Sequence, residues 1–539
     1  MCGILAIFNS TTPLKQNILK HLKKMRHRGP DASGIVYSKN SLYHWAIAHE
    51  RLAIVDPKSG AQPFETDKGT ILAVNGEIYN HEKLKTNKEK TKSDCEVIAT
   101  QYDSNTPIEV MLHSLDGVYA FVLFNRTTGS ILVARDRIGV MPLYYGYGYD
   151  GSIAFASEMK ALEGLVGCVN IFPPGYMYEG GDIRPIPHLA LTYKEFEYKK
   201  TNIDEIDIYC NNIKDKLFKA TEKRIMSDVP WGVLLSGGLD SSIIGYLANR
   251  VNYGNLKTFC IGLEGSQDCK AASKMAEALD SDHTNFTFTK EEGWDAIRDV
   301  IYHLETYDVT TIRAGTPMFL LARKIRALGI KMVLSGEGSD EMFAGYLYFH
   351  NAPNAALLQK ECYDKIEQLH QYDCLRANKA MAAFGVECRV PFLDMHFLDY
   401  VMKEIPAELR MVQNGVEKHI LRESFKDSPI PETILNRQKE QFSDGVGYGW
   451  IDYIKEKTKV YHSIMDRANE FFPIHTPTSA EAFHYRMIFE DLFTTKGSVN
   501  TVPYQKSCAC STGNATRWKG NEKNDASGRS VKQHIETFA

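Results

Sequence analysis

The sequence predicts two domains of different fold class: a strand-rich α+β domain, followed by an α/β domain with a parallel sheet. First, 539 residues are enough for two or three domains of roughly 100–200 residues each. Second, residues 2–190 consist mainly of short β-branched and aromatic runs separated by turn residues. Third, from about Ile208 short apolar runs alternate with helical patterns, as in parallel sheets covered by helices.

The first domain is expected to contain sheets flanked by a few helices. Its candidate strands are short, apolar and bounded by turns, and they span residues 4–8, 47–55, 70–74, 118–124, 130–134 and 153–156. Residues 18–25 and 94–102 instead have apolar side chains at helical spacing. A polar stretch from Glu179 to about Asp207, rich in Gly, Pro and charges, is interpreted as the connection between the domains.

The second domain is expected over residues 208–505. Its candidate strands span residues 229–235, 257–263, 285–289 and 330–334. Helical patterns follow or separate them at residues 241–251, 269–279, 293–305 and 316–328. Residues 506–539 are polar and are expected to form a tail that is disordered or becomes ordered on contact.

Composition is ordinary for a soluble globular protein, and the cytoplasm is its expected location. The net charge of −4 gives no sign of a nucleic-acid surface. No apolar run approaches the roughly 18 residues of a membrane span, and the N-terminus lacks the basic region of a secretory signal. The eleven cysteines are scattered, which favours a reducing compartment, and Cys508 and Cys510 are interpreted as unpaired thiols.

Cys2 is the first candidate catalytic residue. A small residue at position 2 permits removal of Met1, which would leave a thiol and a free α-amine on one residue. An α-amine has a pKa near 7.7–8.0, so it can accept the proton of its own thiol at neutral pH. A cysteine at position 2 is by itself weak evidence, because a chance buried residue is the commoner explanation.

Four neighbouring motifs strengthen the assignment of Cys2. Asn75 and Gly76 offer a side-chain amide and a backbone N–H, which suit an oxyanion hole. Arg51 offers a guanidinium that can hold a carboxylate through two bonds, and Glu77 and Asp94 offer carboxylates for an ammonium group. Free glutamine requires these three kinds of contact, although each segment alone is more often a turn or a solvated face.

The combination resembles the class II glutamine amidotransferases, whose nucleophile is an N-terminal cysteine. The resemblance covers about residues 2–190 and implies a four-layer αββα sandwich. It also implies that Cys2 is the nucleophile and that Asn75 and the Gly76 N–H form the oxyanion hole. Arg51 would then bind the glutamine carboxylate, with Glu77 and Asp94 on its α-amine.

A Gly-rich loop between a strand and a helix is the second candidate site. Residues 234–242 read LLSGGLDSS, and they place two glycines and three serines where backbone N–H groups and a helix N-terminus can meet phosphate. Asp240 could act there through Mg²⁺. The loop lacks the lysine of a Walker motif and is not a G-x-G-x-x-G motif. It resembles the pyrophosphate loop of adenylating ATP pyrophosphatases, which convert a carboxylate to an acyl-adenylate.

Further segments extend this site. Residues 334–341 read LSGEGSDE and follow a candidate strand, so they should lie at the carboxyl edge of the sheet, where ligands bind. Ile261 ends another strand, where adenine could lie. Arg389 and Lys439 are interpreted as phosphate contacts, with surface charges as the alternative.

The whole chain resembles the glutamine-hydrolysing asparagine synthetases, which are ligases. This resemblance implies aspartate, glutamine and ATP as substrates, a β-aspartyl-AMP intermediate, Mg²⁺, an ammonia tunnel and a possible homodimer. Glu337 would handle the adenylate and the ammonia, and Asp240 and Asp340 would hold Mg²⁺. The implied ATP-binding residues are Leu234, Ser236, Gly237, Gly238, Asp240, Ser241, Ser242, Ile261, Ser335, Gly336, Glu337, Arg389 and Lys439.

Three positions depart from the pattern of that family. Val118 and Tyr119 stand where Met and Phe are usual, and this could alter the tunnel wall. Gly315 stands where Ser is common, and this could loosen the aspartate pocket.

Two other functions are compatible with parts of the sequence. A related ligase acting on another carboxylate, such as a β-lactam synthetase, generally lacks the cysteine at position 2, and a degenerate binding protein would have damaged motifs.

Overall fold

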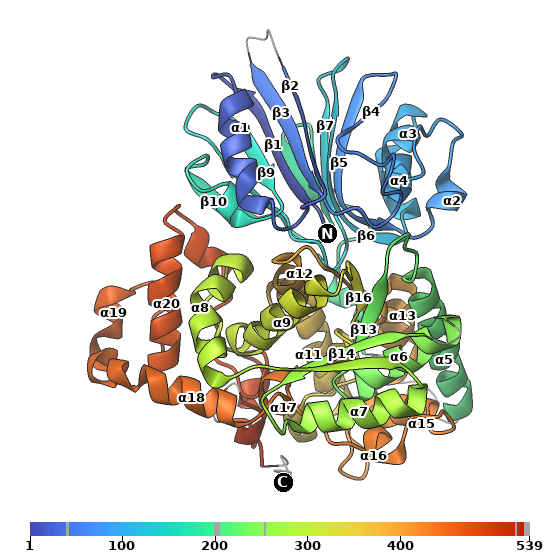
Figure 1. The fold of residues 1–539 in the computed structure, drawn as a ribbon, viewed down its shortest axis with the longest axis vertical. Helices are drawn as coiled ribbons and strands as arrows, with labels where there is room; N and C mark the ends of the chain where they lie inside the picture. The colour runs from blue at the N-terminus through green and yellow to red at the C-terminus, as the bar shows by residue number, and fades with distance from the viewer. Residues whose placement is uncertain (39–42, 199–204, 253–254, 523–524, 526, 533–539) are drawn as a thin grey trace.

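The two domains lie one above the other along the long axis of the molecule, and the N-terminus lies at their junction (Figure 1). The computed structural model describes residues 1–38, 43–198, 205–252, 255–522, 525 and 527–532. The expected interdomain connection includes residues 199–204, which are outside the described part of the chain.

Two six-stranded sheets form the N-terminal domain. The first has the order β10-β8-β9-β1-β3-β2 and the second β12-β11-β7-β6-β5-β4. The first comprises β1 (Gly3–Ser10), β2 (Ala32–Tyr37), β3 (His44–Arg51), β8 (Tyr144–Tyr147), β9 (Ile153–Ala156) and β10 (Cys168–Ile171). The second comprises β4 (Phe64–Glu65), β5 (Thr70–Ile78), β6 (Gly117–Asn125), β7 (Ile131–Arg135), β11 (Tyr176–Glu179) and β12 (Asp182–Pro185).

Helices cover the outer faces of both sheets. Helix α1 (Lys15–Leu22) packs on β1 and β3, and α3 (Val97–Asp103) packs on β5. Because helix and sheet cover its opposite faces, residues 3–8 of β1 are buried throughout. Short helices α2 (His81–Leu84) and α4 (Ile108–Ser114) complete the domain. The result is the predicted helix–sheet–sheet–helix arrangement (Figure 1).

A five-stranded parallel sheet forms the centre of the second domain. Its order is β15-β14-β13-β16-β17, and all four strand pairs are parallel, so every strand ends at the same edge. The strands are β13 (Trp231–Leu234), β14 (Lys257–Gly262), β15 (Asp282–Thr287), β16 (Met332–Leu334) and β17 (Glu387–Arg389). The predicted α/β class is confirmed, although β17 was not predicted.

Sixteen α-helices accompany this sheet in the described part of the chain. They are α5 (Ile206–Lys223), α6 (Leu239–Asn252), α7 (Gln267–Leu279), α8 (Lys290–Leu304), α9 (Val309–Ala327), α10 (Ser339–Met342), α11 (Ala355–Gln368), α12 (Asp373–Ala382), α13 (Met395–Asp399), α14 (Ala407–Arg410), α15 (His419–Ser424), α16 (Glu432–Leu435), α17 (Phe442–Gly445), α18 (Gly449–Thr458), α19 (Ala468–Phe471) and α20 (Ala480–Leu492).

Helix α9 begins seven residues before its predicted start, despite Pro317 inside it. The Asp308 carboxylate caps the helix by accepting the Thr311 N–H at 2.7 Å. Proline has no N–H for the carbonyl of Arg313, four residues earlier. The indole N–H of Trp450 donates to that carbonyl at 2.9 Å instead, so the helix continues through the proline.

The described part of the polar C-terminal segment packs against the second domain. Cys508, Ala509 and Ala515 are buried, and Thr512 donates its N–H and hydroxyl to Glu361 at 2.9 and 2.5 Å.

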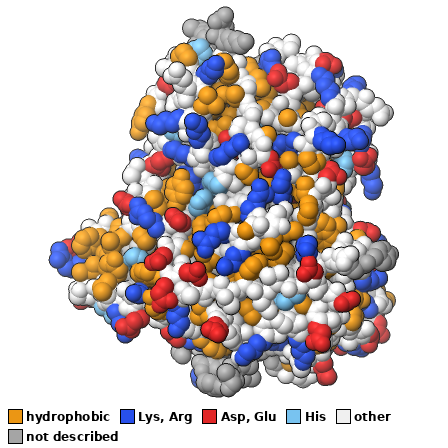
Figure 2. Space-filling model, in the orientation of Figure 1, with side chains coloured by type: hydrophobic (Ala, Val, Ile, Leu, Met, Phe, Trp, Pro, Cys, Tyr) orange, Lys and Arg blue, Asp and Glu red, His pale blue; other side chains and the backbone are white. Residues whose placement is uncertain are grey.

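None of the helices in the described residues has the length and apolar character needed to cross a bilayer. Charges of both signs are interspersed on the face in Figure 2, and apolar side chains gather around α19 and α20.

Buried ion pairs join the two domains. Glu158 of the first domain pairs with Lys160 at 2.6 Å and with Arg28 at 2.8 Å. Glu305, next to the end of α8 in the second domain, pairs across the junction with Lys160 at 3.2 Å and accepts the N–H groups of residues 159 and 160. It also pairs with Lys379 of its own domain at 2.5 Å. Burial alone would raise the pKa of Glu305, but the Lys160 and Lys379 ammonium groups outweigh it and lower that pKa.

We expect the substitution Glu305→Gln to lower the free energy of unfolding by about 3–5 kcal/mol, because it leaves Lys379 charged and buried with no carboxylate partner. Urea denaturation measures the change. Asp215→Asn is the matched control: its ion pair with Lys219 is more than half exposed, so the change should stay below about 1 kcal/mol. Equal effects of both substitutions would contradict a structural role for the junction.

Candidate functional sites

Cys2 lies immediately before β1 at the domain junction, as the first of two sites. Its thiol is partly buried and lies 3.8 Å from the carbonyl oxygen of Leu52. The Arg28 guanidinium donates to the Cys2 carbonyl at 2.8 Å and so fixes the backbone that carries the thiol. Burial raises the pKa of the Cys2 thiol, and the nearby N-terminal ammonium opposes that rise. The thiol therefore needs an adjacent base to act as a nucleophile.

Asn75, on β5, is placed to serve an oxyanion. Its side-chain oxygen accepts the Cys2 N–H at 2.8 Å, so the Asn75 amide group lies next to Cys2. The Nδ2 group of Asn75 is fully buried and has no hydrogen-bond partner among the described residues, so it can donate to a bound group. Gly76 has φ +151°, and a Cβ there would lie 2.1 Å from the Val118 carbonyl oxygen. Only glycine fits this close approach of β5 and β6.

The three residues expected to bind free glutamine surround this point. The Arg51 guanidinium is buried and contacts the carbonyl oxygens of residues 55–57 at 2.6–3.3 Å, which orients it. Asp94 accepts the Ile78 N–H at 2.7 Å. Burial raises the pKa of both Glu77 and Asp94, and their proximity to one another raises that of Glu77 further, against the effect of Arg389. A bound ammonium group would offset the unfavourable energy of burying two neighbouring carboxylates.

The second domain completes the same site through β17. The Met1 α-amine is buried and pairs with Glu387 at 2.8 Å. Arg389 pairs with Glu387 at 2.7 Å and with Glu77 at 3.0 Å. It also donates to the backbone carbonyls of residues 224 and 226 and lies over the Tyr79 ring. The expected phosphate contact of Arg389 is therefore not supported, because its guanidinium is used at the glutamine side of the junction.

A cavity at the carboxyl edge of the parallel sheet forms the second site. It lies between the loops after β13 and β16 and the segment of residues 437–443. Eleven residues predicted from the sequence line it: Leu234, Ser236, Gly238, Asp240, Ser241, Ile261, Ser335, Gly336, Glu337, Asp340 and Lys439. One end is apolar, with Phe259 and Met318, and the other is charged. That polarity suits a molecule with an aromatic base and a polyphosphate.

Hydrogen bonds between its serines fix the conformation of the Gly-rich loop. The Ser241 hydroxyl lies 3.0 Å from that of Ser236 and accepts the Ser236 N–H at 3.2 Å. Gly237 has φ +69°, and a Cβ there would lie 2.4 Å from Ala271 of α7. Gly237 and Ser242 do not line the cavity; they shape the turn before α6 and the packing beneath it.

Glu337 faces the cavity with a fixed orientation. Arg376 of α12 donates to both Glu337 oxygens at 2.9 Å. Burial raises the pKa of Glu337, and the Arg376 guanidinium opposes the rise. Arg376 was not singled out in the sequence, since it is an isolated charge in a mixed segment.

Two carboxylates converge on one buried lysine that sequence reasoning missed. Lys418 lies 2.7 Å from both oxygens of Asp240 and 2.6 Å from Asp340, and Asp340 also pairs with Lys439 at 2.6 Å. Lys418 has φ +58°, a strained conformation for a lysine. A Cβ at Gly345 would lie 1.9 Å from the Lys418 side chain, so glycine provides its space. The lysines outweigh burial and lower the pKa of Asp340.

This donor set fits Mg²⁺ only together with phosphate oxygens. Among the described residues, no group of three or more His, Cys, Asp or Glu side chains could hold a metal ion. Two convergent carboxylates match Mg²⁺ sites in which phosphates and waters complete the octahedron. Asp240 and Asp340 would then exchange part of their contact with Lys418 for the ion.

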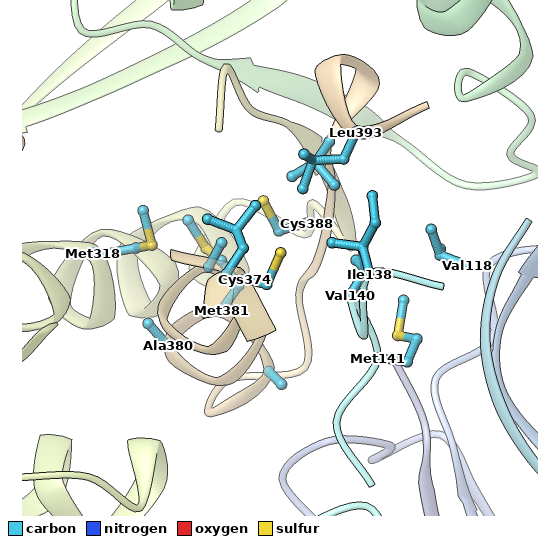
Figure 3. Packing of buried hydrophobic residues seen from close by; sticks show 14 of the residues in the cluster. Val118, Ile138, Val140, Met141, Met318, Cys374, Ala380, Met381, Cys388 and Leu393 are labelled. Carbon is cyan, nitrogen blue, oxygen red and sulfur yellow. The ribbon is translucent and has the colours of Figure 1, made fainter. Parts of the chain in front are cut away.

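An apolar cluster lies between the two sites. It begins at Val118, which pairs with Glu77 across β5 and β6, and it reaches Met318 in the cavity wall. Figure 3 labels ten residues of the extended apolar core in this region: Val118, Ile138, Val140, Met141, Met318, Cys374, Ala380, Met381, Cys388 and Leu393. Tyr119 belongs to a separate cluster on the other face of its sheet, so of the two departures only Val118 borders this region. Gly315, in α9, packs against Leu304 of α8.

Comparisons with known proteins give the same division of the chain. A family model described as glutamine amidotransferase domain matches residues 1–171, and one described as asparagine synthase matches residues 212–359 and 352–507. A glutamine-hydrolysing asparagine synthetase of Zea mays is 48% identical, over 99% of this chain and 94% of its own. Asparagine synthetase B of Escherichia coli is 47% identical over 100% of both chains.

Proposed function

This chain belongs to the family of glutamine-hydrolysing asparagine synthetases, and from that premise we propose a role for each of its sites. The reaction is the ATP-dependent synthesis of asparagine from aspartate with ammonia from glutamine. The observation that carries the assignment of roles is the pairing of the two sites. One site has Cys2 beside the Asn75 amide, which has no partner among the described residues. The other is the cavity lined by hydroxyls, acids and lysines, and it lies in the second domain, on the other side of the buried junction.

In the glutaminase site, we infer that Cys2 attacks the side-chain amide of glutamine. Once Met1 is removed, the Cys2 α-amine takes the thiol proton, and the Asn75 side-chain oxygen, which accepts the Cys2 N–H at 2.8 Å, orients that amine. The Asn75 Nδ2 group and the Gly76 N–H donate to the developing oxyanion. Arg51 holds the α-carboxylate, and Glu77 and Asp94 hold the α-ammonium.

In the synthetase cavity, ATP lies with its base against the apolar wall and its phosphates over the Gly-rich loop. Ser236, Ser241 and backbone N–H groups bind the phosphates, and Lys439 offsets their charge. Asp240 and Asp340 would hold Mg²⁺, which would offset the negative charge of the phosphates. The aspartate side-chain carboxylate attacks the α-phosphorus, pyrophosphate leaves, and β-aspartyl-AMP forms.

Ammonia then reaches the adenylate, and Glu337 accepts the proton that it loses on attack. Burial raises the pKa of Glu337, which makes its carboxylate a stronger base than an exposed one. We infer that ammonia travels along the apolar cluster between the sites, where few polar groups could protonate or retain it. The finer expectations remain proposals: domains over residues 2–190 and 208–505, a cytoplasmic location and a homodimer.

One assay of purified protein tests the proposed function. With aspartate, Mg·ATP and glutamine supplied together, we expect asparagine, AMP, pyrophosphate and glutamate to form in near-equal amounts. Asparagine reports amide formation, AMP and pyrophosphate report adenylation, and glutamate reports glutamine hydrolysis. Release of glutamate without AMP would mean that aspartate is the wrong acid, and ADP in place of AMP would refute adenylation.

A further inference from the structure

Two cysteines meet at the wall of the nucleotide cavity. Cys260 lies on β14 between Phe259 and Ile261, and all three line the cavity. Cys269 lies in the first turn of α7, the helix that follows the same strand (Figure 1). The two sulfur atoms are 3.6 Å apart, in direct contact without a bond. We propose that Cys260 and Cys269 form a reversible disulfide that controls nucleotide binding in the synthetase cavity.

The geometry allows the bond with a small movement. A disulfide requires sulfur atoms about 2.0 Å apart, so the pair must close by roughly 1.6 Å. Rotation of two side chains and a slight shift of the first turn of α7 can supply this. A Cβ at Gly262 would lie 3.0 Å from the Cys269 sulfur, so glycine at this position leaves the space in which the sulfur can move.

The two thiols differ in exposure and in acidity, and thiol–disulfide exchange needs one accessible, acidic thiol. Cys260 is 3% exposed, whereas Cys269 is only partly buried, so an outside reagent meets Cys269 first. The Cys260 thiol hydrogen-bonds to Cys269 and lowers the pKa of Cys269, and Ser266 lowers it further. A thiolate in the first turn of a helix is also favoured by the helix dipole.

The reaction balances with a small-molecule disulfide as the oxidant. The Cys269 thiolate attacks one sulfur of that disulfide, forms a mixed disulfide and releases one small thiolate. The Cys260 thiol then loses its proton and attacks the Cys269 sulfur, which releases the second small thiol. Two protein thiols are oxidised, and the small disulfide is reduced to two thiols.

The bond would alter the cavity because α7 is tied to the segment that closes it. Asp268, next to Cys269, lines the cavity and pairs with Arg437 at 2.7 Å. The Ser266 hydroxyl donates to the Gly445 carbonyl at 2.9 Å. Movement of the first turn of α7 toward β14 therefore displaces residues 437–445, which include Lys439.

The test uses the full chain with Cys2→Ala and ammonia as the nitrogen donor, so that oxidation of the nucleophile cannot contribute. The protein is equilibrated with mixtures of reduced and oxidised glutathione, and asparagine formation is measured. We expect the rate to fall by more than about tenfold on oxidation and to return with excess thiol, since a misplacement of about 1 Å can cost roughly 10²-fold. Cys269→Ser in the same background should stay active, and Cys168→Ser should remain sensitive.

Peptide mass provides an independent readout. Trypsin cuts after Lys257 and Lys270, so both cysteines fall in one peptide that contains no other cysteine. On oxidation this peptide should lose two hydrogens and resist alkylation. A peptide that stays a dithiol, or that gains glutathione without an internal bond, overturns the proposal. So does a disulfide that leaves the rate unchanged, or equal loss of activity in Cys269→Ser.

The effect on rate rests on the proposed function of the cavity, and the two can fail separately. If the reduced protein makes no asparagine from aspartate, Mg·ATP and ammonia, the proposed function is wrong, whatever the peptide mass shows. If the reduced protein is active and oxidation changes neither mass nor rate, only the disulfide proposal is wrong.

Discussion

Replacing Cys2 by alanine should abolish glutamine-dependent asparagine synthesis and preserve synthesis from ammonia. Loss of the nucleophile removes the route through the covalent γ-glutamyl thioester, so glutamine hydrolysis should fall roughly 10⁴- to 10⁶-fold. The synthetase cavity is formed by residues of the second domain, so adenylation should continue. Alanine is also small enough to permit removal of Met1.

The measurement is asparagine formation with each nitrogen donor in turn. Cys168→Ala is the matched control, because this partly buried thiol lies on β10, outside both sites, and both activities should be kept. If Cys2→Ala lost both activities equally while remaining folded, the assignment of a separate glutaminase site would fail.

Replacing Glu337 by glutamine should have the opposite pattern, with asparagine synthesis lost for both nitrogen donors and glutamine hydrolysis retained. An amide cannot accept the proton that ammonia releases, and this kind of proton transfer contributes about 10²- to 10⁴-fold. The substitution also removes the charge that the Arg376 guanidinium binds at 2.9 Å. The assay compares asparagine, AMP and glutamate formation in the variant and the parent.

Glu341→Gln is the matched control four residues further along. Burial, with the added repulsion of Asp373 and Asp340, raises the pKa of Glu341 to about 8, so this acid is mostly protonated at pH 7. Glutamine closely resembles a protonated glutamate, and Glu341 does not line the cavity, so activity should change by less than about threefold. Similar losses in both variants would mean that the loop tolerates no substitution, and the assigned role of Glu337 would lose its support.

The elements that could be predicted are those whose signal is local. The strands and helices around the Gly-rich loop follow from apolar spacing and from turn residues within about ten positions. Strand β17, by contrast, has three residues, and it forms only because β16 offers its edge. Likewise α9 could not be predicted to continue through Pro317, since its carbonyl at residue 313 is satisfied by Trp450, 137 residues away.

The same distinction separates the site residues. Cys2, Asn75 and the two Gly-rich loops stand in recognisable motifs, and the structure brings them into two sites. Lys418 and Arg376 were missed because their partners, Asp240 and Glu337, lie 178 and 39 positions away. Arg389 was given a phosphate role on its charge alone, and only the fold shows that it pairs with Glu77 and Glu387.

The burial of the Met1 amine against Glu387 has a consequence for the timing of protein synthesis. The two residues are 386 positions apart, so at about 5–20 residues per second the ribosome adds Glu387 roughly 20–80 s after Met1. Throughout that interval the methionine has no partner from β17 and is accessible to an aminopeptidase. Once the second domain has folded, the amine is enclosed. Maturation of the nucleophile is therefore a race between peptidase and folding, and faster translation or scarce peptidase would leave a permanently uncleaved fraction.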